Sequence, residues 1–335
     1  MESPLVSVIC TNYNKSKWIE QTIRSLLSQK TNFNFEILVI DDASTDDSPG
    51  IIQKIYEENL DKIRFFKNEE NLGIAKTWKK ICNEARGKYI ARCDGDDYWI
   101  SEEKLQKQVD LLKKSKDSKW CNTEFQTENE KGEILFRKSF AENFVKMPED
   151  FTEMLISKGF TNASTWLIET ELMKEVNDTL DITTPDDTFD IQLELFIRTK
   201  LSTVKDPMVS YRFTTGSDSH PEDLSKIQER NQRLLKTQIN FLQKYQDKVN
   251  FLQATKELLE KQTTLENYLA EKEISILERN KLLNDRQKFI DEQGLIIKHH
   301  EDSVRDLENN IEELENQKWF GLHKIIYKDS KKEKK

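Results

Sequence analysis

Three aspartates fall within four positions of this sequence. Asp94, Asp96 and Asp97 follow a short run of aromatic and aliphatic residues, and Tyr98 and Trp99 come directly after them. Negative charges this close repel one another unless a cation lies between them. Carboxylate oxygens suit Mg²⁺ or Mn²⁺, and magnesium characteristically joins one or two protein carboxylates to substrate phosphates. The cluster therefore indicates a site for a divalent cation and a phosphorylated ligand, although an acidic solvated turn has the same spacing.

Further polar residues follow the neighbouring predicted strands. Asn12 ends the first strand and Tyr13 follows it, Asp42 comes after the second strand, and Asn71 and Gly73 come after the third. Ligands of open α/β sheets bind beyond the carboxyl ends of the strands, so these residues are expected to share one edge with the acidic cluster. A carboxylate at position 42 is suited to accept hydrogen bonds from a nucleotide base or ribose.

The order of apolar patterns predicts the scaffold that positions these residues. Short runs rich in β-branched and aromatic residues alternate with segments whose apolar residues recur every three or four positions. This alternation predicts an α/β, Rossmann-like fold in which helices flank a mixed, mainly parallel sheet. The expected strands are 5–12, 35–41, 63–67 and 88–93, and the expected helices are 17–28, 47–59 and 74–85.

Composition and motifs argue against several classes of protein. The net charge of −9 disfavours a nucleic-acid binder that depends on phosphate neutralisation, so no nucleic-acid partner is expected. The loop 10–18 has no glycine, which rules out a GxGxxG cradle, and no GxxxxGK[ST] P-loop occurs. The four cysteines lack CxxC pairing, as expected for reduced thiols rather than a disulfide frame or a zinc site.

Four segments together resemble the N-terminal half of the family-2 inverting glycosyltransferases of the GT-A fold. They are VSVICTNYN (6–14), VIDDASTD (39–46), NLGIAKTW (71–78) and GKYIARCDGDDYW (87–99). Their order, spacing and strand placement agree with that family, strongly over residues 4–115 and loosely over 116–217. The resemblance implies a GT-A domain over 1–217, of the bacterial type that carries a C-terminal coiled-coil extension.

The resemblance assigns roles to the strand-end residues. Thr11 and Tyr13 would line a nucleotide pocket, with Tyr13 against the base, and Asp42 would hold the base or ribose. Asp94 and Asp96 would match the DxD motif that meets ribose and metal. The implied nucleotide-binding set is Thr11, Tyr13, Asp42, Asn71, Gly73 and Asp94, and the implied metal ligands are Asp96 and Asp97, with Asp94 as a further candidate.

An acidic segment downstream resembles the place where such enzymes carry their general base. Within TTPDDTFDIQLELFIR (183–198), Asp190 is the first choice for the residue that takes the proton of the acceptor hydroxyl, ahead of Asp187 and then Asp186. Aspartates there are also suited to capping a helix. The segment YRFTTGS (211–217) resembles the closing loop of the family, but Thr214 stands where relatives often carry a metal-binding histidine, and His220 is an alternative metal ligand.

These inferences predict inverting transfer of a sugar from a nucleoside-diphosphate sugar, uridine-linked, to a hydroxyl of a glycan, lipid-linked or protein acceptor. A divalent cation, Mn²⁺ or Mg²⁺, would offset the charge that develops on the leaving diphosphate. The alternative is a non-catalytic nucleotide-binding scaffold that assembles partners through its C-terminal helices. A nucleotidyltransferase is disfavoured because the glycine-rich first loop of that class is missing.

Residues 222–317 contain no proline and a single glycine, and they are expected to form a helical arm. A first heptad series runs from Leu235 to Leu259, and a second continues from Leu269 to Ile311 in steps of seven. The ten-residue step between the two series predicts a hinge or local overwinding. The arm is expected to form a coiled-coil homo-oligomer or to fold back as a helical hairpin.

The final segment, 318–335, combines aromatic and aliphatic residues with clustered lysines. Such a segment can lie in an anionic membrane interface and bring an enzyme to a lipid-linked acceptor, or it can simply end a packed helix. The sequence shows no basic, apolar leader and no 18-residue apolar stretch. The expected location is therefore the cytoplasm, with peripheral contact at the inner face of the plasma membrane.

Overall fold

The computed structural model describes residues 3–182, 187–214 and 221–329, and it describes side chains over 3–182, 188–214, 221–316 and at 318. The chain divides into two compact units, Met1–Leu259 and Glu260–Lys335. The expected boundary after residue 217 differs from this division, because more than 40 further residues lie in the first unit.

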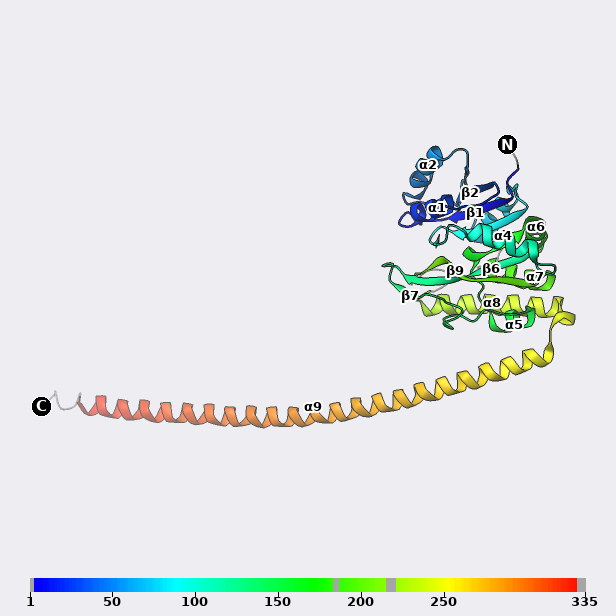
Figure 1. Cartoon of the computed structure of the whole chain (residues 1–335). Coiled ribbons are helices and arrows are strands. Elements are labelled where there is room, and N and C mark those ends of the chain that lie inside the picture. Colours follow the sequence, from blue (N-terminus) through cyan, green and yellow to red (C-terminus); the bar gives the residue numbers. More distant parts are fainter. Residues whose placement is uncertain (1–2, 183–186, 215–220, 330–335) are drawn as a thin grey trace. The chain divides into compact units, whose positions relative to one another are not determined.

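One mixed sheet of nine strands forms the centre of the first unit within the described residues (Figure 1). Its order is β3-β2-β1-β4-β8-β6-β9-β5, with β7 paired to β6. The first four strands run parallel, as predicted, whereas β8 pairs antiparallel with both β4 and β6. The strands are β1 (Val6–Asn12), β2 (Phe35–Asp41), β3 (Ile63–Lys67), β4 (Tyr89–Asp94), β5 (Tyr98–Trp99), β6 (Trp120–Asn129), β7 (Ile134–Phe136), β8 (Leu167–Glu169) and β9 (Leu201–Phe213).

Helices cover both faces of the sheet and continue beyond it. The three helices predicted between the first four strands all form, so the α/β prediction is confirmed. The helices, including the short 3₁₀ turns η1 and η2, are α1 (Ile19–Leu27), α2 (Ser48–Glu58), α3 (Ile74–Cys82), α4 (Lys104–Lys114), α5 (Phe151–Ser157), η1 (Ala163–Thr165), α6 (Thr170–Thr179), α7 (Asp187–Arg198), α8 (Leu224–Lys244), η2 (Gln246–Lys248) and α9 (Phe251–Asp329).

Alternating side chains of the central strands build two cores. Val8 and Cys10 of β1 face one way and pack with α1, α2 and α4, while Ile9 faces the other way and packs with α3 and α6. This alternation follows from the two-residue period of a strand. Each fully buried aliphatic side chain contributes roughly 1.5–3 kcal/mol to the free energy of folding. The two cores therefore hold the strand ends in fixed positions.

A third core attaches α8 to the first unit. Leu234 and Phe241 of α8 pack with Met154 of α5 and Leu193 of α7. Polar contacts reinforce the packing, because the hydroxyl of Tyr245 donates to the carboxylate of Glu194 at 2.9 Å and Gln238 Nε2 donates to the carbonyl of Leu155. These contacts explain why the compact unit extends past the expected domain boundary.

The second unit consists of the helix α9 beyond Leu259. The helix is uninterrupted, so residues 260–329 do not fold back as a hairpin, and the ten-residue step does not break it. The first heptad series is divided by η2 and the residues flanking it. In the second series, Ile276, Leu283 and Ile290 are exposed. No helix of the described residues is long and apolar enough to cross a bilayer.

Candidate active site

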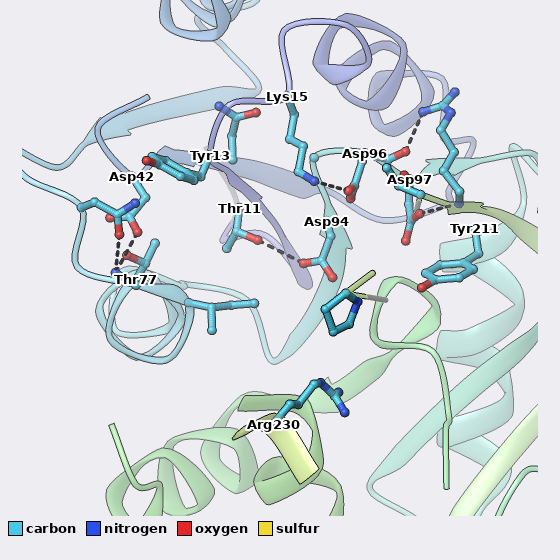
Figure 2. A pocket seen from close by; sticks show the side chains of 18 of the residues that line it. Thr11, Tyr13, Lys15, Asp42, Thr77, Asp94, Asp96, Asp97, Tyr211 and Arg230 are labelled. Carbon is cyan, nitrogen blue, oxygen red and sulfur yellow. Dashed lines mark hydrogen bonds and ion pairs between the residues drawn. The ribbon is translucent and has the colours of Figure 1, made fainter. Parts of the chain in front are cut away.

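A pocket of about 720 Å³ lies at the carboxyl ends of β1, β2 and β4 (Figure 2). Its volume is ordinary for a small-molecule site. Residues from β9 and α8 complete the lining. The residues that line the pocket are Thr11, Asn12, Tyr13, Lys15, Asp42, Asn71, Gly73, Ile74, Thr77, Asp94, Gly95, Asp96, Asp97, Tyr211, Arg212, Thr214, Pro221, Lys226, Glu229, Arg230 and Arg233.

The end of β1 supplies one wall of the pocket. Thr11 pairs in register with Asp94 of the parallel strand β4, and Thr11 Oγ1 donates to Asp94 Oδ1 at 3.0 Å. Asn12 Nδ2 donates to Asp41 Oδ1 at 2.7 Å and so ties the ends of β1 and β2 together. Tyr13 comes next and is 43% exposed, so its ring is not part of the core and is accessible to a ligand.

Asp42 organises the turn after β3. Its Oδ1 accepts hydrogen bonds from Asn68 Nδ2 at 2.7 Å and from the backbone N–H of Leu72 at 3.0 Å. Its Oδ2 accepts from the backbone N–H of Gly73 at 3.0 Å. Gly73 has φ +82°, a conformation that side chains with a Cβ rarely adopt. Three residues that were predicted from the sequence to bind nucleotide therefore meet at the pocket. Asn71 and Gly73 belong to the turn, and Asp42 holds the turn through hydrogen bonds.

Asp94 sits over a buried arginine. Arg92 Nε donates to Asp94 Oδ1 at 2.9 Å, and the Arg92 guanidinium lies 4.6 Å from the centroid of the Trp78 ring. A buried guanidinium needs an acidic partner, so this pair fixes the Asp94 carboxylate at the pocket. The backbone N–H of Asp94 also donates to Ser164 Oγ at 3.0 Å. The Asp94 side chain keeps 30% of its surface exposed.

Asp96 is paired with a lysine from the loop that follows β1. Lys15 Nζ lies 2.5 Å from Asp96 Oδ2, and Figure 2 shows this contact between the β1 and β4 loops. Burial by itself would lower the pKa of Lys15, but the charge and hydrogen bond of Asp96 outweigh it, and the pKa is raised. The Asp96 side chain is 21% exposed. Two partly exposed carboxylates, Asp94 and Asp96, therefore face the pocket.

Asp97 points into the protein. Its Oδ2 accepts from Ser164 Oγ at 2.6 Å and its Oδ1 accepts from the backbone N–H of Arg212 at 3.0 Å. Burial, followed by the charge of Asp96, raises the pKa of Asp97 well above the ordinary value. Both oxygens are thus occupied by contacts that attach the acidic turn to η1 and β9.

Arg212 of β9 also holds the turn that contains Asp96 and Asp97. Its guanidinium donates to the backbone carbonyl of Asp96 at 2.6 Å, and its Nε lies 2.8 Å from Glu128 Oε1. The guanidinium also lies 4.8 Å from the centroid of the Tyr98 ring. Because Arg212 and Glu128 are both buried, each compensates the charge of the other.

Asp190 is the one candidate base whose side chain the structure describes. Asp190 is 4% exposed in α7 and is not among the residues that line the pocket. The side chain of Asp187 falls outside the described residues, as do Asp186 and His220. Thr214 does line the pocket.

Sequence reasoning missed several pocket residues. It named neither Lys15 nor Arg212, and it assigned the whole of α8 to a separate arm. Lys226, Arg230 and Arg233 nonetheless line the pocket. Their spacing of four and then three residues was the available signal, because it places all three on one face of a helix.

Among the described residues, no group of three histidine, cysteine or acidic side chains could hold a metal ion. Asp94 and Asp96 offer accessible hard oxygens, and Mg²⁺ commonly takes one or two carboxylates together with substrate phosphates.

The braced turns over one pocket at the sheet edge define an α/β ligand-binding domain. The Staphylococcus aureus TarS fragment 1–349, solved in complex with UDP-GlcNAc, matches it with a TM-score of 0.51 and 20% identity, over 72% of this chain and 73% of that chain. At this identity the likeness shows the fold, which is GT-A. The sequence profile described as Glycosyl transferase family 2 matches residues 7–175, and the chain belongs to that family.

Two curated relatives add detail. The putative teichuronic acid biosynthesis glycosyltransferase TuaG of Bacillus subtilis is 39% identical over 109 residues, which are 32% of this chain and 42% of TuaG. The Escherichia coli protein WfaP, named UDP-Glc:alpha-D-GlcNAc-diphosphoundecaprenol beta-1,3-glucosyltransferase, is 39% identical over 112 residues, 33% of this chain and 43% of WfaP. The match spans about two fifths of the length of these relatives.

Proposed function

We propose that this chain transfers a sugar from a nucleoside-diphosphate sugar to a hydroxyl acceptor, with inversion at the anomeric carbon. One observation carries the proposal: the Asp42 turn and the Asp94–Asp96 turn line a single pocket of about 720 Å³. Family membership supports the reaction class. A uridine-linked donor is supported by the name of WfaP and by the UDP-GlcNAc bound to the TarS fragment.

In this proposal each of the two turns binds a different part of the donor. Tyr13, with its exposed ring, flanks the base. The turn around Asn71 and Gly73, braced by Asp42, binds the base or ribose. Asp94, held by Thr11 and Arg92, meets the ribose and the start of the diphosphate. Each group is fixed by contacts within the protein, so little ordering is needed when the donor binds.

Asp94 and Asp96 are proposed to hold Mn²⁺ or Mg²⁺. A divalent cation there, when bound, offsets the negative charge that grows on the leaving diphosphate. The ion either displaces Lys15 from Asp96, so that the ammonium group can face a phosphate oxygen, or shares the Asp96 carboxylate with it. Asp97 is proposed to position the turn instead, because its two oxygens accept hydrogen bonds from Ser164 and Arg212.

The general base is proposed to come from the acidic start of α7, with Asp190 as first choice and Asp187 as second. The base takes the proton of the acceptor hydroxyl while the acceptor oxygen bonds to the anomeric carbon. The bond from that carbon to the phosphate oxygen breaks, and its electron pair leaves with the diphosphate. A positioned carboxylate contributes roughly 10²–10⁴ in rate, so D190N should lose transfer by about that factor if Asp190 is the base.

The donor half of the proposal is tested by thermal unfolding with nucleoside diphosphates. UDP plus Mn²⁺ should raise the melting temperature of the wild type, and hydrolysis of a panel of nucleotide sugars should identify the donor. No shift with any nucleoside diphosphate would contradict donor binding. Shifts without transfer to any acceptor would instead favour a nucleotide-binding scaffold.

The class of acceptor is proposed with the support of one relative. WfaP is named as acting on a diphosphoundecaprenol-linked sugar, and a glycan, lipid-linked or protein acceptor is proposed here.

The exposed residues in steps of seven along α9, such as Leu283 and Ile290, are proposed to form a homo-oligomeric coiled coil. Light scattering should give a multiple of the chain mass for the wild type and a monomer for the L283R/I290R variant. A monomeric wild type would contradict the coiled coil.

Residues 318–335 are proposed to touch the inner face of the plasma membrane. The full chain should then float with vesicles that contain anionic lipid and not with neutral vesicles, since lysines near a surface gain about 1 kcal/mol each from anionic lipids. Absence of the full chain from both vesicle fractions would contradict the contact.

A further inference from the structure

One face of α8 lines the nucleotide pocket. Lys226, Glu229, Arg230 and Arg233 are spaced by three, one and three residues, which places them on a single side of the helix. All four line the pocket. Figure 2 shows Arg230 on the wall across from Asp94.

The other face of α8 is anchored, so the orientation of the helix is fixed. Leu234 and Phe241 are buried in the third core, and Gln238 Nε2 donates to the carbonyl of Leu155. Asp223 caps the helix by accepting from the backbone N–H groups of Ser225 and Lys226. The basic face is therefore held toward the pocket by the same contacts that attach α8 to the first unit.

Charge is distributed unequally between the two walls. The sheet wall carries the carboxylates of Asp42, Asp94 and Asp96. Its cations Lys15 and Arg212 pair with Asp96 and Glu128. The α8 wall carries three cations and one acid, Glu229, which pairs with Arg233. A diphosphate entering beside these carboxylates would be repelled unless cations offset its charge.

A second lysine lies close to Arg230. Lys158, the C-cap residue of α5, has its pKa lowered first by burial and then by the positive charge of Arg230. Like charges that approach each other repel, and a bound anion would relieve that repulsion.

We infer that α8 supplies the cations that bind the donor diphosphate, with Arg230 at the centre and Lys226 and Arg233 beside it. This inference rests on the proposed function. Arg230 is then a donor-binding residue contributed from beyond the segment that matches the family profile. The guanidinium suits this role because it donates two parallel hydrogen bonds to phosphate oxygens.

The test compares UDP affinity, measured by calorimetry in EDTA, for the wild type, R230Q, R230K and K236Q. Lys236 is an exposed lysine of α8 that does not line the pocket, so K236Q is the matched control. R230Q should weaken UDP binding roughly tenfold or more, because hydrogen bonds to charged groups are worth about 1.5–3 kcal/mol. R230K should recover part of the loss, and K236Q should match the wild type. Uridine, which lacks the diphosphate, should bind R230Q and the wild type equally.

The outcomes separate the inference from the proposed function. A wild type that binds UDP neither in EDTA nor with Mn²⁺ would overturn both. A wild type that binds UDP only with Mn²⁺ would overturn the role of α8 and leave the proposed function standing. A wild type that binds UDP, with R230Q and K236Q matching it, would overturn only the role of α8. Equal losses of UDP and uridine affinity in R230Q would also overturn it, because the residue would then act on the nucleoside or the fold. Unfolding temperatures of the unliganded variants check the fold.

Discussion

Lys15 Nζ lies 2.5 Å from Asp96 Oδ2, so an ammonium group stands beside the carboxylate proposed to bind a divalent cation. The pair joins the loop after β1 to the acidic turn after β4. A metal ion and the lysine cannot both occupy the same side of one carboxylate oxygen. Binding of the ion must therefore displace Lys15 or share Asp96 with it.

The first prediction follows from this competition. K15M removes the ammonium group and keeps most of the aliphatic stem. Mn²⁺ affinity without nucleotide, measured by electron paramagnetic resonance, should rise several-fold, as expected for a competing pair worth up to about 1 kcal/mol. K17M is the control, because Lys17 contacts the carbonyl of Glu130 rather than an acid of the pocket. Unchanged or weaker Mn²⁺ binding in K15M would speak against competition at Asp96.

The second prediction concerns the backbone of the Asp42 turn. Gly73 has φ +82° and an added Cβ would meet nothing within 4 Å, so G73A tests backbone strain alone. We expect G73A to lose about 1–3 kcal/mol of unfolding free energy and to weaken UDP binding, because the φ +82° and ψ 164° of Gly73 are essentially restricted to glycine. Gly50 also has open space around an added Cβ, but it lies in α2, where alanine is favoured.

G50A should therefore gain roughly 0.5–1 kcal/mol and leave UDP binding unchanged. Urea unfolding and calorimetry give both quantities for each variant. Equal effects of G73A and G50A would remove the argument that the left-handed conformation shapes the nucleotide turn.

The third prediction tests whether α8 belongs to the first unit. Leu234 is 6% exposed and packs in the third core, whereas its neighbour Leu235 is 47% exposed. L234A should cost roughly 2–5 kcal/mol of unfolding free energy of the first unit, because it removes buried surface and leaves a cavity. L235A should change stability by about 0.5 kcal/mol or less. A reversed order, measured by urea unfolding, would mean that the helix faces the other way.

The fourth prediction concerns Lys104, which lies fully buried with its ammonium group 4.0 Å from the centroid of the Trp99 ring. Burial lowers the pKa of Lys104 from 10.5 to about 7. Between these values the unfolded chain holds a proton at this site that the folded chain lacks. Stability contributed by this group therefore rises with pH from about 7 to about 10.5, at up to about 1.4 kcal/mol per pH unit.

K104M should remove this rise, and unfolding free energies at pH 7.5 and 9.5 for both proteins measure it. The informative quantity is the difference in slope, because K104M also takes the partner from Gln108 Oε1 and shifts stability at every pH. Parallel pH profiles for K104M and the wild type would contradict a neutral buried Lys104.

Local hydrophobic patterns explain why the first four strands and the helices between them could be predicted from the sequence. The first four strands and three helices alternate along the chain with short connections, so their periodicity decides them. The strand-end acids follow from that alternation. By contrast, β8 lies between β4 and β6, a pairing of residues far apart in sequence that no local pattern contains.

The position of α8 shows the limit most clearly. The heptad series identified in the sequence passes through Leu235 and Leu242. The residues that are buried in the structure are Leu234 and Phe241, each one position earlier. A shift of one residue rotates the face of a helix by about 100°. Both series are apolar, and only the packing against α5 and α7 selects between them. The buried pair of Arg212 with Glu128 was likewise invisible in the sequence, because Arg212 lies in β9 and Glu128 in β6.

A crystal structure of the full chain with UDP and Mn²⁺ tests the proposed donor site most directly. The base should lie beside Tyr13 and the turn at Asn71 and Gly73, with the diphosphate and the ion at Asp94 and Asp96 in the same pocket. A nucleotide bound at another surface, or a base and diphosphate that do not span these two turns, would contradict the proposed donor site.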